Sequence, residues 1–340
     1  MIDVRKIQSV DLDYLSYLIS TNKYDDEIFQ KADEIRRRYV GDEVHLRAII
    51  EFSNYCSQHC LYCGLRSDNK NLTRYRMSVP EILERAKLIA ELGIKTIVLQ
   101  SGEDPFYTTE IMNEIITSIK KLDVAITLSI GERSFEEYRI WKELGADRYL
   151  MRHETASPEL YAKLHPGDSF EHRKAHLFEL KRLGYETGAG FMVGLPDQTS
   201  YDLALDLAFL KELDADMIGI GPFIPNPDTP LAKSAGGNLQ TTLKMLALAR
   251  IVVPTANIPA TTALGSIHPF GRQYGLKFGA NVIMPNLTPN PYRPNYSLYP
   301  GKICLFEKDT ACVECTKAMI KSLSLRVGEG FGYRKHIAQF

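Results

Sequence analysis

Three cysteines in one short segment are the residues of this chain with the clearest capacity for chemistry. Cys56, Cys60 and Cys63 stand in the pattern Cys-x3-Cys-x2-Cys, with no fourth cysteine nearby. Four thiolates would bind a cubane iron–sulfur cluster, with one thiolate for each iron. Three thiolates leave one iron with an open coordination site, and a small molecule can bind and react at such a site.

A zinc site is the main alternative for these thiols. Zinc prefers four ligands in a tetrahedral arrangement, and His59 could supply the fourth. However, His59 directly precedes Cys60 in the sequence, which makes joint coordination of one ion awkward. The spacing therefore favours an iron–sulfur cluster over zinc or unrelated thiols.

The overall composition is that of an ordinary globular protein. Of the 340 residues, 44% are apolar and 24% are charged, and the formal net charge is −1. This balance gives no electrostatic reason to expect nucleic acid or an anionic membrane as a partner. We find no apolar run that could span a bilayer and no signal-peptide core after Met1. We expect a cytoplasmic protein, where cysteines stay reduced and often bind metals or take part in catalysis.

Alternating strand and helix patterns must position the cysteines. Eight strand patterns lie at 46–52, 95–100, 123–129, 147–151, 185–191, 216–220, 257–262 and 281–284. Helical patterns lie between them, at 78–92, 107–120, 134–144, 169–182, 199–213 and 239–253. This alternation predicts an α/β fold, a TIM-type (β/α)8 barrel with parallel strands. An open doubly wound sheet is the alternative, but its Gly-x-Gly-x-x-Gly fingerprint is absent after the first strand.

Three regions are expected along the chain. Residues 1–44 are predicted to be a helical extension, 45–284 the barrel, and 285–340 a cysteine-bearing tail packed on the barrel. In such barrels the active site lies at the carboxyl ends of the strands. The cysteine segment follows the first strand and therefore lies at that end.

Polar residues recur where the other predicted strands end. They are Ser101, Glu103, Thr127, Ser129, Arg152, Glu154, Thr261 and Thr262. Arg152 and Glu154 are two apart and so share a strand face, with His153 on the opposite face. Taken singly, these residues could be turn formers, β-formers or a structural ion pair, and Arg173 on the next helix could be a solvated surface residue. Taken together, they suit a ligand that carries charges of both signs.

The motifs also resemble those of a known superfamily. Cys-x3-Cys-x2-Cys after the first strand, Tyr62 within it, and the run Ser101-Gly102-Glu103-Asp104 resemble radical S-adenosylmethionine (radical SAM) proteins. Further runs narrow the resemblance to the HydE-type family of iron-iron hydrogenase maturases, relatives of biotin synthase and methylornithine synthase. These runs are 50–54, 61–66, 152–156, 187–190, 222–225, 228–230, 281–286, 300–304 and 312–315.

The resemblance implies an enzyme that uses a 4Fe-4S cluster and S-adenosylmethionine. The three cysteines would bind the cluster, and an electron from it would cleave S-adenosylmethionine to methionine and a 5′-deoxyadenosyl radical. Residues implied in cofactor binding are Tyr62, Ser101, Glu103, Thr127, Ser129, Glu154, Arg173 and Met192, with Ser101 and Glu103 at the methionine end, Glu154 at the ribose and Arg173 at the carboxylate. Residues implied to face the substrate are Arg152, Thr261, Thr262 and Tyr296.

The resemblance also implies a role, partners and a second metal site. The substrate would be small and organometallic, used in assembly of the dinuclear iron H-cluster. The partners would be an electron donor, a tyrosine lyase and a GTPase scaffold. Cys304, Cys312 and Cys315 match positions of a second iron–sulfur cluster in some members, with zinc or free thiols as alternatives.

Two other functions remain open from the sequence. One is a biotin synthase-like or methylornithine synthase-like enzyme that acts on a small organic substrate, although no cysteine is left over for an auxiliary cluster inside the barrel. The other is a non-catalytic iron–sulfur carrier, which would not need the polar strand ends.

Overall fold

Six parallel strands in chain order form the main sheet of this protein. The computed structural model describes residues 1–307 and 309–335; residues 308 and 336–340 of the predicted tail lie outside the described residues. The six strands are β2 (Ala48–Ser53), β3 (Thr96–Ser101), β4 (Ala125–Ser129), β5 (Arg148–Leu150), β6 (Glu186–Val193) and β7 (Met217–Pro222). A second sheet has the order β8 (Val282–Ile283), β1 (Glu43–Leu46) and β9 (Arg326–Val327).

Isolated bridges continue the parallel pairing from β7 round to β2. These bridges join Met217 to Asn257, Pro259 to Val282, and Ile49 to Asn286. The pairing therefore runs round a ring, as the predicted (β/α)8 barrel requires. The predicted strand at 257–262 differs in detail, because it pairs through single bridges instead of a regular ladder. Pro259 contributes to this irregularity, since proline has no backbone N–H to donate.

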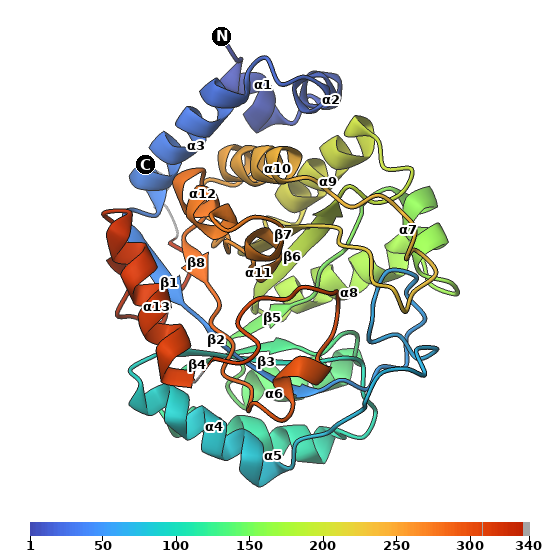
Figure 1. The fold of residues 1–340 in the computed structure, drawn as a ribbon, viewed down its shortest axis with the longest axis vertical. Helices are drawn as coiled ribbons and strands as arrows, with labels where there is room; N and C mark the ends of the chain where they lie inside the picture. The colour runs from blue at the N-terminus through green and yellow to red at the C-terminus, as the bar shows by residue number, and fades with distance from the viewer. Residues whose placement is uncertain (308, 336–340) are drawn as a thin grey trace.

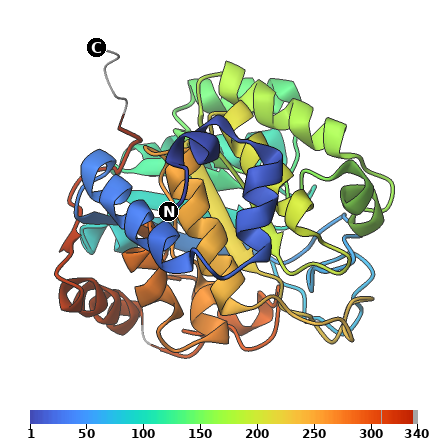
Figure 2. The ribbon, with the colours of Figure 1, turned by 90° about the horizontal axis from the view of Figure 1, so that it is seen from above.

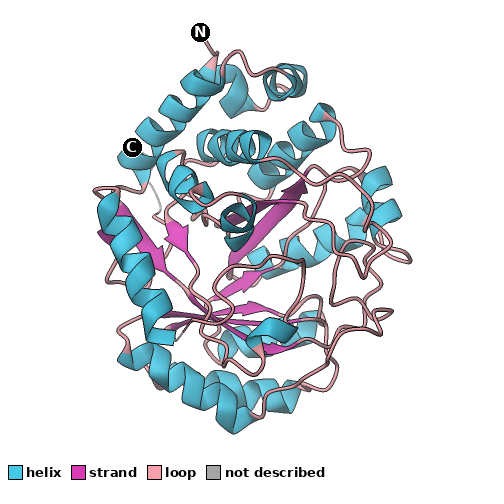
Figure 3. Ribbon diagram, viewed as in Figure 1, coloured by secondary structure: helices cyan, strands magenta, loops and turns pink. Residues whose placement is uncertain are grey.

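The longer helices lie around the outside of the strands (Figure 3). The six predicted helices are present with ends within two residues of prediction, as α4 (Val79–Glu91), α5 (Thr109–Lys120), α6 (Phe135–Glu143), α8 (Phe170–Arg182), α9 (Ser200–Glu212) and α10 (Leu239–Val252). Capping boxes start α4, α6 and α9, where a Ser or Thr and the acidic residue three positions later satisfy free N–H groups reciprocally. Shorter helices that the periodicity did not predict are α7 (Pro158–Leu164), α11 (Thr262–Ile267), α12 (Gly271–Lys277) and the 3-10 turn η1 (Arg293–Asn295).

Three N-terminal helices cover one side of the barrel. They are α1 (Val4–Ser9), α2 (Leu12–Ser20) and α3 (Asp25–Tyr39), and they pack on α9 and α10 (Figures 1 and 2). A buried ion pair fixes this packing, with Lys244 Nζ of α10 2.8 Å from Asp25 Oδ1 of α3. The same ammonium donates to the Thr21 carbonyl at 2.7 Å, just after α2 ends.

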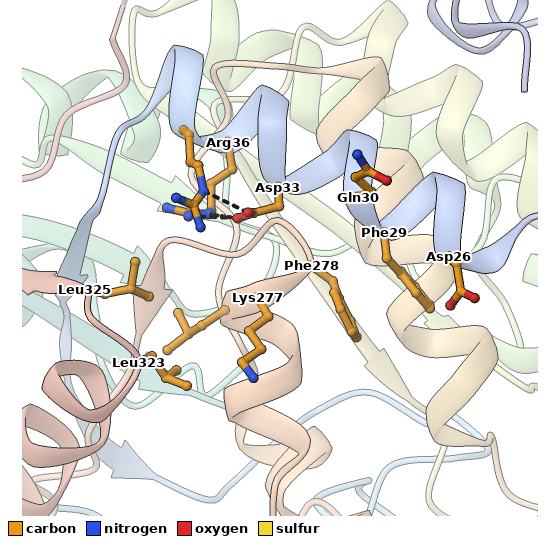
Figure 4. Close-up of a pocket in the computed structure, with 11 residues that line it drawn as sticks. Asp26, Phe29, Gln30, Asp33, Arg36, Lys277, Phe278, Leu323 and Leu325 are labelled. Atoms are coloured by element: carbon orange, nitrogen blue, oxygen red, sulfur yellow. Dashed lines mark hydrogen bonds and ion pairs between the residues drawn. The ribbon is translucent and has the colours of Figure 1, made fainter.

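A cavity of about 440 Å³ lies between α3, α12 and the tail (Figure 4). Its wall includes Phe29 and Phe278, whose rings stack at 4.2 Å, and the ion pair of Arg36 with Asp33. None of its lining residues belongs to the cysteine segment or to the carboxyl ends of the strands. The cavity is therefore separate from the expected active site.

The tail contains α13 (Asp309–Ser322), which was not predicted, and then runs beneath the barrel. The carbonyl of Phe331 accepts hydrogen bonds from Thr96 Oγ1 at 2.9 Å and Arg148 Nη2 at 2.8 Å, both at the first residues of strands. The carbonyl of Gly332 accepts from Arg47 at 3.0 Å. The tail thus contacts the amino ends of the strands, opposite the cysteine segment. Within the described residues, no helix is long and apolar enough to cross a membrane.

Candidate active site

The cysteine segment follows β2 and is tied by its backbone to neighbouring strand ends and loops. Ser57 N–H donates to the Glu103 carbonyl at 2.9 Å, beyond the end of β3. Leu61 N–H donates to the Leu164 carbonyl at 2.9 Å, at the end of α7. In Figure 1 this light-blue loop lies beside α7. Gly64 approaches the tail so closely that a Cβ atom there would lie 2.0 Å from the Ser297 carbonyl oxygen.

One arginine organises the loop from within. The Arg74 guanidinium donates to the carbonyls of Leu65 at 2.9 Å, Arg66 at 2.7 Å and Asn69 at 3.2 Å, and also to the carbonyl of Asn54. These four carbonyls lie on both sides of the cysteines. Arg74 therefore joins the two ends of the loop, and sequence reasoning did not identify it.

The arrangement of the three thiols fits a cluster better than a single ion. Zinc–sulfur bonds of about 2.3 Å would place tetrahedral sulfur ligands about 3.8 Å apart. Among the described residues, the one group of three potential ligands with atoms within 4.8 Å of one another contains no cysteine. The proposed extra ligand His59 is turned to Asp68, with Nδ1 2.8 Å from Oδ2.

Burial makes bare thiolates unfavourable at this place. Burial raises the pKa of the Cys63 thiol to about 12, and it also raises the pKa values of Cys56 and Cys60. Buried thiolates of this kind are stabilised by a bound cationic metal centre. The donor set and its surroundings thus fit an iron–sulfur cluster.

Glu103 lies beside the cysteines, beyond the end of β3. Its Oε2 accepts from Gln58 Nε2 at 2.5 Å and its Oε1 accepts from the Glu132 N–H at 3.0 Å. Gly131 makes room for this side chain, because a Cβ atom there would lie 2.0 Å from Glu103 Cγ. Ser101 at the end of β3 is buried and donates to the Gly102 carbonyl at 2.6 Å.

Arg152 and Glu154 form an ion pair after β5, on the shared face that the sequence predicted. Arg152 Nη2 lies 3.0 Å from Glu154 Oε2, and its Nε donates to Oε1 at 3.1 Å. Glu154 has φ of +63°, which costs energy for a residue other than glycine and often marks a functional site. His153 points the other way, is fully buried, and accepts from the Gly190 N–H at 3.2 Å.

Arg173 is not a solvated surface residue. Its side chain is 12% exposed, and its Nε lies 2.7 Å from Oε1 of Glu132 in the loop after β4. Its Nη1 also donates to the Arg152 carbonyl at 3.4 Å. Sequence reasoning missed Glu132, although the residue lies only three positions after the end of β4.

Tyr62 and Met192 come together at the edge of the cysteine segment. Both belong to a small apolar cluster between the end of β6 and α7. Tyr62 also contacts His165, with Oη 2.8 Å from Nε2, and His165 Nδ1 lies 3.0 Å from the Tyr161 carbonyl. The aromatic ring is therefore held in place on both its apolar and its polar side.

Comparisons with known proteins agree with this geometry. Residues 50–209 match the model of the Radical SAM superfamily. The chain is 61% identical over 319 residues to the FeFe hydrogenase maturase subunit HydE of Thermotoga maritima, covering 94% of this chain and 92% of that protein. This chain belongs to the HydE family of radical SAM enzymes. It is also 31% identical to 3-methylornithine synthase of Methanosarcina acetivorans, over 76% of this chain and 73% of that protein.

Two solved structures share the fold. Methylornithine synthase (PylB) superposes with a TM-score of 0.83 at 24% identity, covering 96% of this chain and 97% of that one. The maturase HydG from Carboxydothermus hydrogenoformans has a TM-score of 0.77 at 22% identity, covering 94% of this chain and 77% of that one. Radical SAM membership implies a 4Fe-4S cluster and S-adenosylmethionine as cofactors.

The remaining predicted site residues of this radical SAM chain lie at different depths. Ser129 is the last residue of β4, whereas Thr127 lies mid-strand on an interior cavity of about 20 Å³ that Arg47 also lines. Thr261 donates to the Ile220 carbonyl at 3.3 Å and precedes α11, whose first residue is Thr262. The fully enclosed Tyr296 hydroxyl lies 3.3 Å from Gln100 Nε2.

Two of the three tail cysteines, Cys304 and Cys312, are in hydrogen-bond contact. Cys312 and Cys315 are one turn apart on α13, and Cys315 is exposed. A hydrogen bond from the Cys312 thiol lowers the pKa of Cys304 to about 7. Arg293 donates to the Cys304 carbonyl at 3.4 Å and holds that segment close to the barrel.

Proposed function

We propose that this chain takes part in maturation of the FeFe hydrogenase, in assembly of its dinuclear iron centre. The observation that carries the proposal is 61% identity over nearly the whole length of a protein named as such a maturase. The identity to 3-methylornithine synthase is half as high and covers less of the chain. The polar strand ends support a small substrate bound within the barrel.

The cysteines Cys56, Cys60 and Cys63 would hold the 4Fe-4S cluster. When bound, this cluster supplies the electron that cleaves S-adenosylmethionine to methionine and a 5′-deoxyadenosyl radical. The partial burial of the three cysteines would limit the access of water to the radical. The chain's other residues would bind and orient the cofactor.

We assign the cofactor contacts by position. Ser101 and Glu103 would hold the methionine amino group, because both lie beside the cysteine segment. Arg173 would bind the carboxylate with its Nη donors, since its Nε already binds Glu132. Glu154 would bind the ribose hydroxyls, and Arg152 would hold Glu154 in its strained conformation.

Further cofactor contacts would come from four residues around this centre: Tyr62, Thr127, Ser129 and Met192. The substrate would bind deeper in the barrel, next to Arg152, Thr261, Thr262 and Tyr296. A small organometallic molecule with iron and diatomic ligands fits the proposed role.

The proposed partners are an electron donor, the tyrosine lyase that makes the diatomic ligands, and the GTPase scaffold that receives the product. We place these steps in the cytoplasm, where all six cysteines would remain reduced. We also propose that Cys304, Cys312 and Cys315 hold a second iron–sulfur cluster near the surface.

In-vitro maturation tests the proposal directly. Apo-hydrogenase would be incubated anaerobically with the lyase, the scaffold, S-adenosylmethionine and dithionite, with and without this chain, and hydrogen production would be measured. Activity should depend on the chain, and Cys60→Ala should abolish both activity and 5′-deoxyadenosine formation. Cleavage of S-adenosylmethionine without any gain in hydrogenase activity would refute the maturation role and favour a small organic substrate.

A further inference from the structure

Two histidines and a glutamate converge beside the proposed cofactor site. His172 and His176 lie one turn apart on α8, and their Nε2 atoms are 3.4 Å apart. Glu132 Oε2 lies 3.3 Å from His172 Nδ1 and 3.9 Å from His176 Nε2. Ligand atoms of all three residues fall within 4.8 Å of one another. We call these three residues the His–His–Glu cluster.

We propose that the His–His–Glu cluster binds a divalent transition-metal ion of the zinc type. Zinc–nitrogen bonds of 2.0–2.1 Å at a tetrahedral angle place two imidazole nitrogens about 3.3 Å apart. The observed 3.4 Å between the two Nε2 atoms matches that separation. Two imidazoles and one carboxylate are also a common protein ligand set for zinc, with a fourth position for water. The site is distinct from both cysteine groups.

The surroundings of the histidines orient them as ligands. A metal-bound histidine usually donates its other ring N–H to a carboxylate or another oxygen acceptor. His172 Nδ1 lies 3.1 Å from Asp168 Oδ1 and 3.3 Å from Glu132 Oε2, so Nε2, which faces His176 Nε2, is the atom that would bind the ion. His176 Nδ1 lies 3.0 Å from the Tyr138 hydroxyl, which is held by the Arg133 N–H at 3.0 Å.

Asp168 is itself held in place for this task. Its Oδ2 accepts from the Tyr161 hydroxyl at 2.9 Å, and its Oδ1 accepts from the Ser169 N–H at 2.7 Å. The carboxylate, the imidazole of His172 and the proposed ion therefore form a carboxylate–histidine–metal arrangement.

The ion would share the Glu132 carboxylate with Arg173. Glu132 Oε1 pairs with Arg173 Nε at 2.7 Å, while Oε2 faces the histidines. A bound cation would weaken the hold of Glu132 on Arg173 and add positive charge beside it. Metal binding should then change the KM for S-adenosylmethionine, and this consequence alone rests on the role proposed for Arg173.

Zinc binding to the anaerobically reconstituted full chain tests the site. Zinc would be titrated calorimetrically into the wild type, His172→Gln and His176→Gln, with His268→Gln as the matched control. His172 is 56% exposed, so its replacement does not disturb the core. We expect each cluster variant to bind zinc at least about 100-fold more weakly, because replacement of a residue that only hydrogen-bonds a ligand already lowers metal affinity by about 10–100-fold. The control should bind like the wild type.

X-ray absorption at the zinc edge identifies the ligands in the same samples. We expect nitrogen and oxygen neighbours at about 2.0 Å and no sulfur at about 2.3 Å. A zinc shell made of sulfur would place the ion at the cysteines and overturn the proposal. Wild-type affinity in both His172→Gln and His176→Gln would overturn it as well. Neither readout depends on S-adenosylmethionine cleavage or on hydrogenase maturation.

Discussion

Replacement of Arg74 by lysine should loosen the loop that carries Cys56, Cys60 and Cys63 without changing any of these three cysteines. The guanidinium binds four carbonyls, those of Asn54, Leu65, Arg66 and Asn69. A lysine ammonium on a flexible stem can keep one or two of these bonds. Hydrogen bonds of charged groups contribute about 1.5–3 kcal/mol each, and partial exposure of Arg74 lowers this figure. We therefore expect the loop to lose about 2–3 kcal/mol of local stability, which corresponds to about 30–150-fold more frequent opening.

The rate of iron release measures this opening. A ferrous-iron chelator would be added in excess to the reconstituted protein under anaerobic conditions, and release would be followed by absorbance. Arg74→Lys should release iron at least about 30-fold faster, in keeping with a loss of 2 kcal/mol. Arg37→Lys is the matched control, because Arg37 is exposed and pairs with Asp33 on α3. Equal release rates for the wild type and Arg74→Lys would refute the idea that this side chain secures the loop.

Three further changes test other parts of the structure. Cys312→Ala should remove any signal of a second cluster from the electron paramagnetic resonance spectrum, because an iron–sulfur cluster is held by cysteine thiolates. Formation of 5′-deoxyadenosine should stay within about twofold of wild type, because Cys56, Cys60 and Cys63 are unchanged. Lys244→Met should lower the free energy of unfolding in urea by about 3–5 kcal/mol, because it leaves the buried Asp25 with a hydrogen bond from Gln240 but without a cationic partner; a loss below about 1 kcal/mol would contradict this. Burial lowers the pKa of four histidines, to about 3 for His153 and to about 4 for His45, His165 and His176, so only the unfolded chain takes up these protons between pH 6.5 and pH 5. Stability should therefore fall by about 1.6 kcal/mol per histidine over this range, and His45→Gln should keep about three quarters of this shared fall in urea titrations.

Most of the barrel could be predicted because its elements are long and regular. All six longer helices begin after a Ser, Thr or Asn cap, α4, α5 and α6 also have clear amphipathic periodicity, and β2 to β7 are mostly buried. The strand at 257–262 could not be predicted correctly in detail, because the pattern does not show how Pro259 interrupts the ladder. The short helices α7, α11 and α12 span too few turns for a period to be visible. The tail helix α13 lies in a segment whose prolines predict loops and whose cysteines predict a metal site, and neither pattern predicts a helix.

The site could be predicted only where the fold itself fixes a position. Parallel strands bring Ser101, Arg152 and Glu154 to one end of the barrel, and this placement does not depend on the conformation of the loops. Their partners depend on loop conformation, and so Glu132 and Arg74 were missed. For the same reason the sequence does not distinguish Arg173 from a surface residue, because its contact with Glu132 depends on the conformation of the loop after β4.

Four of the charges at the mouth of the barrel form two opposite pairs. Arg152 binds Glu154, and Arg173 binds Glu132. A partly buried charge is costly without a partner, so each pair keeps the site stable before any ligand arrives. A zwitterionic ligand can exchange contacts with such pairs one by one, with its carboxylate meeting an arginine and its cationic groups meeting a glutamate. A ligand of one sign would leave a buried charge without compensation. The pairing therefore selects for a molecule that carries both charges, which is the chemical character of S-adenosylmethionine.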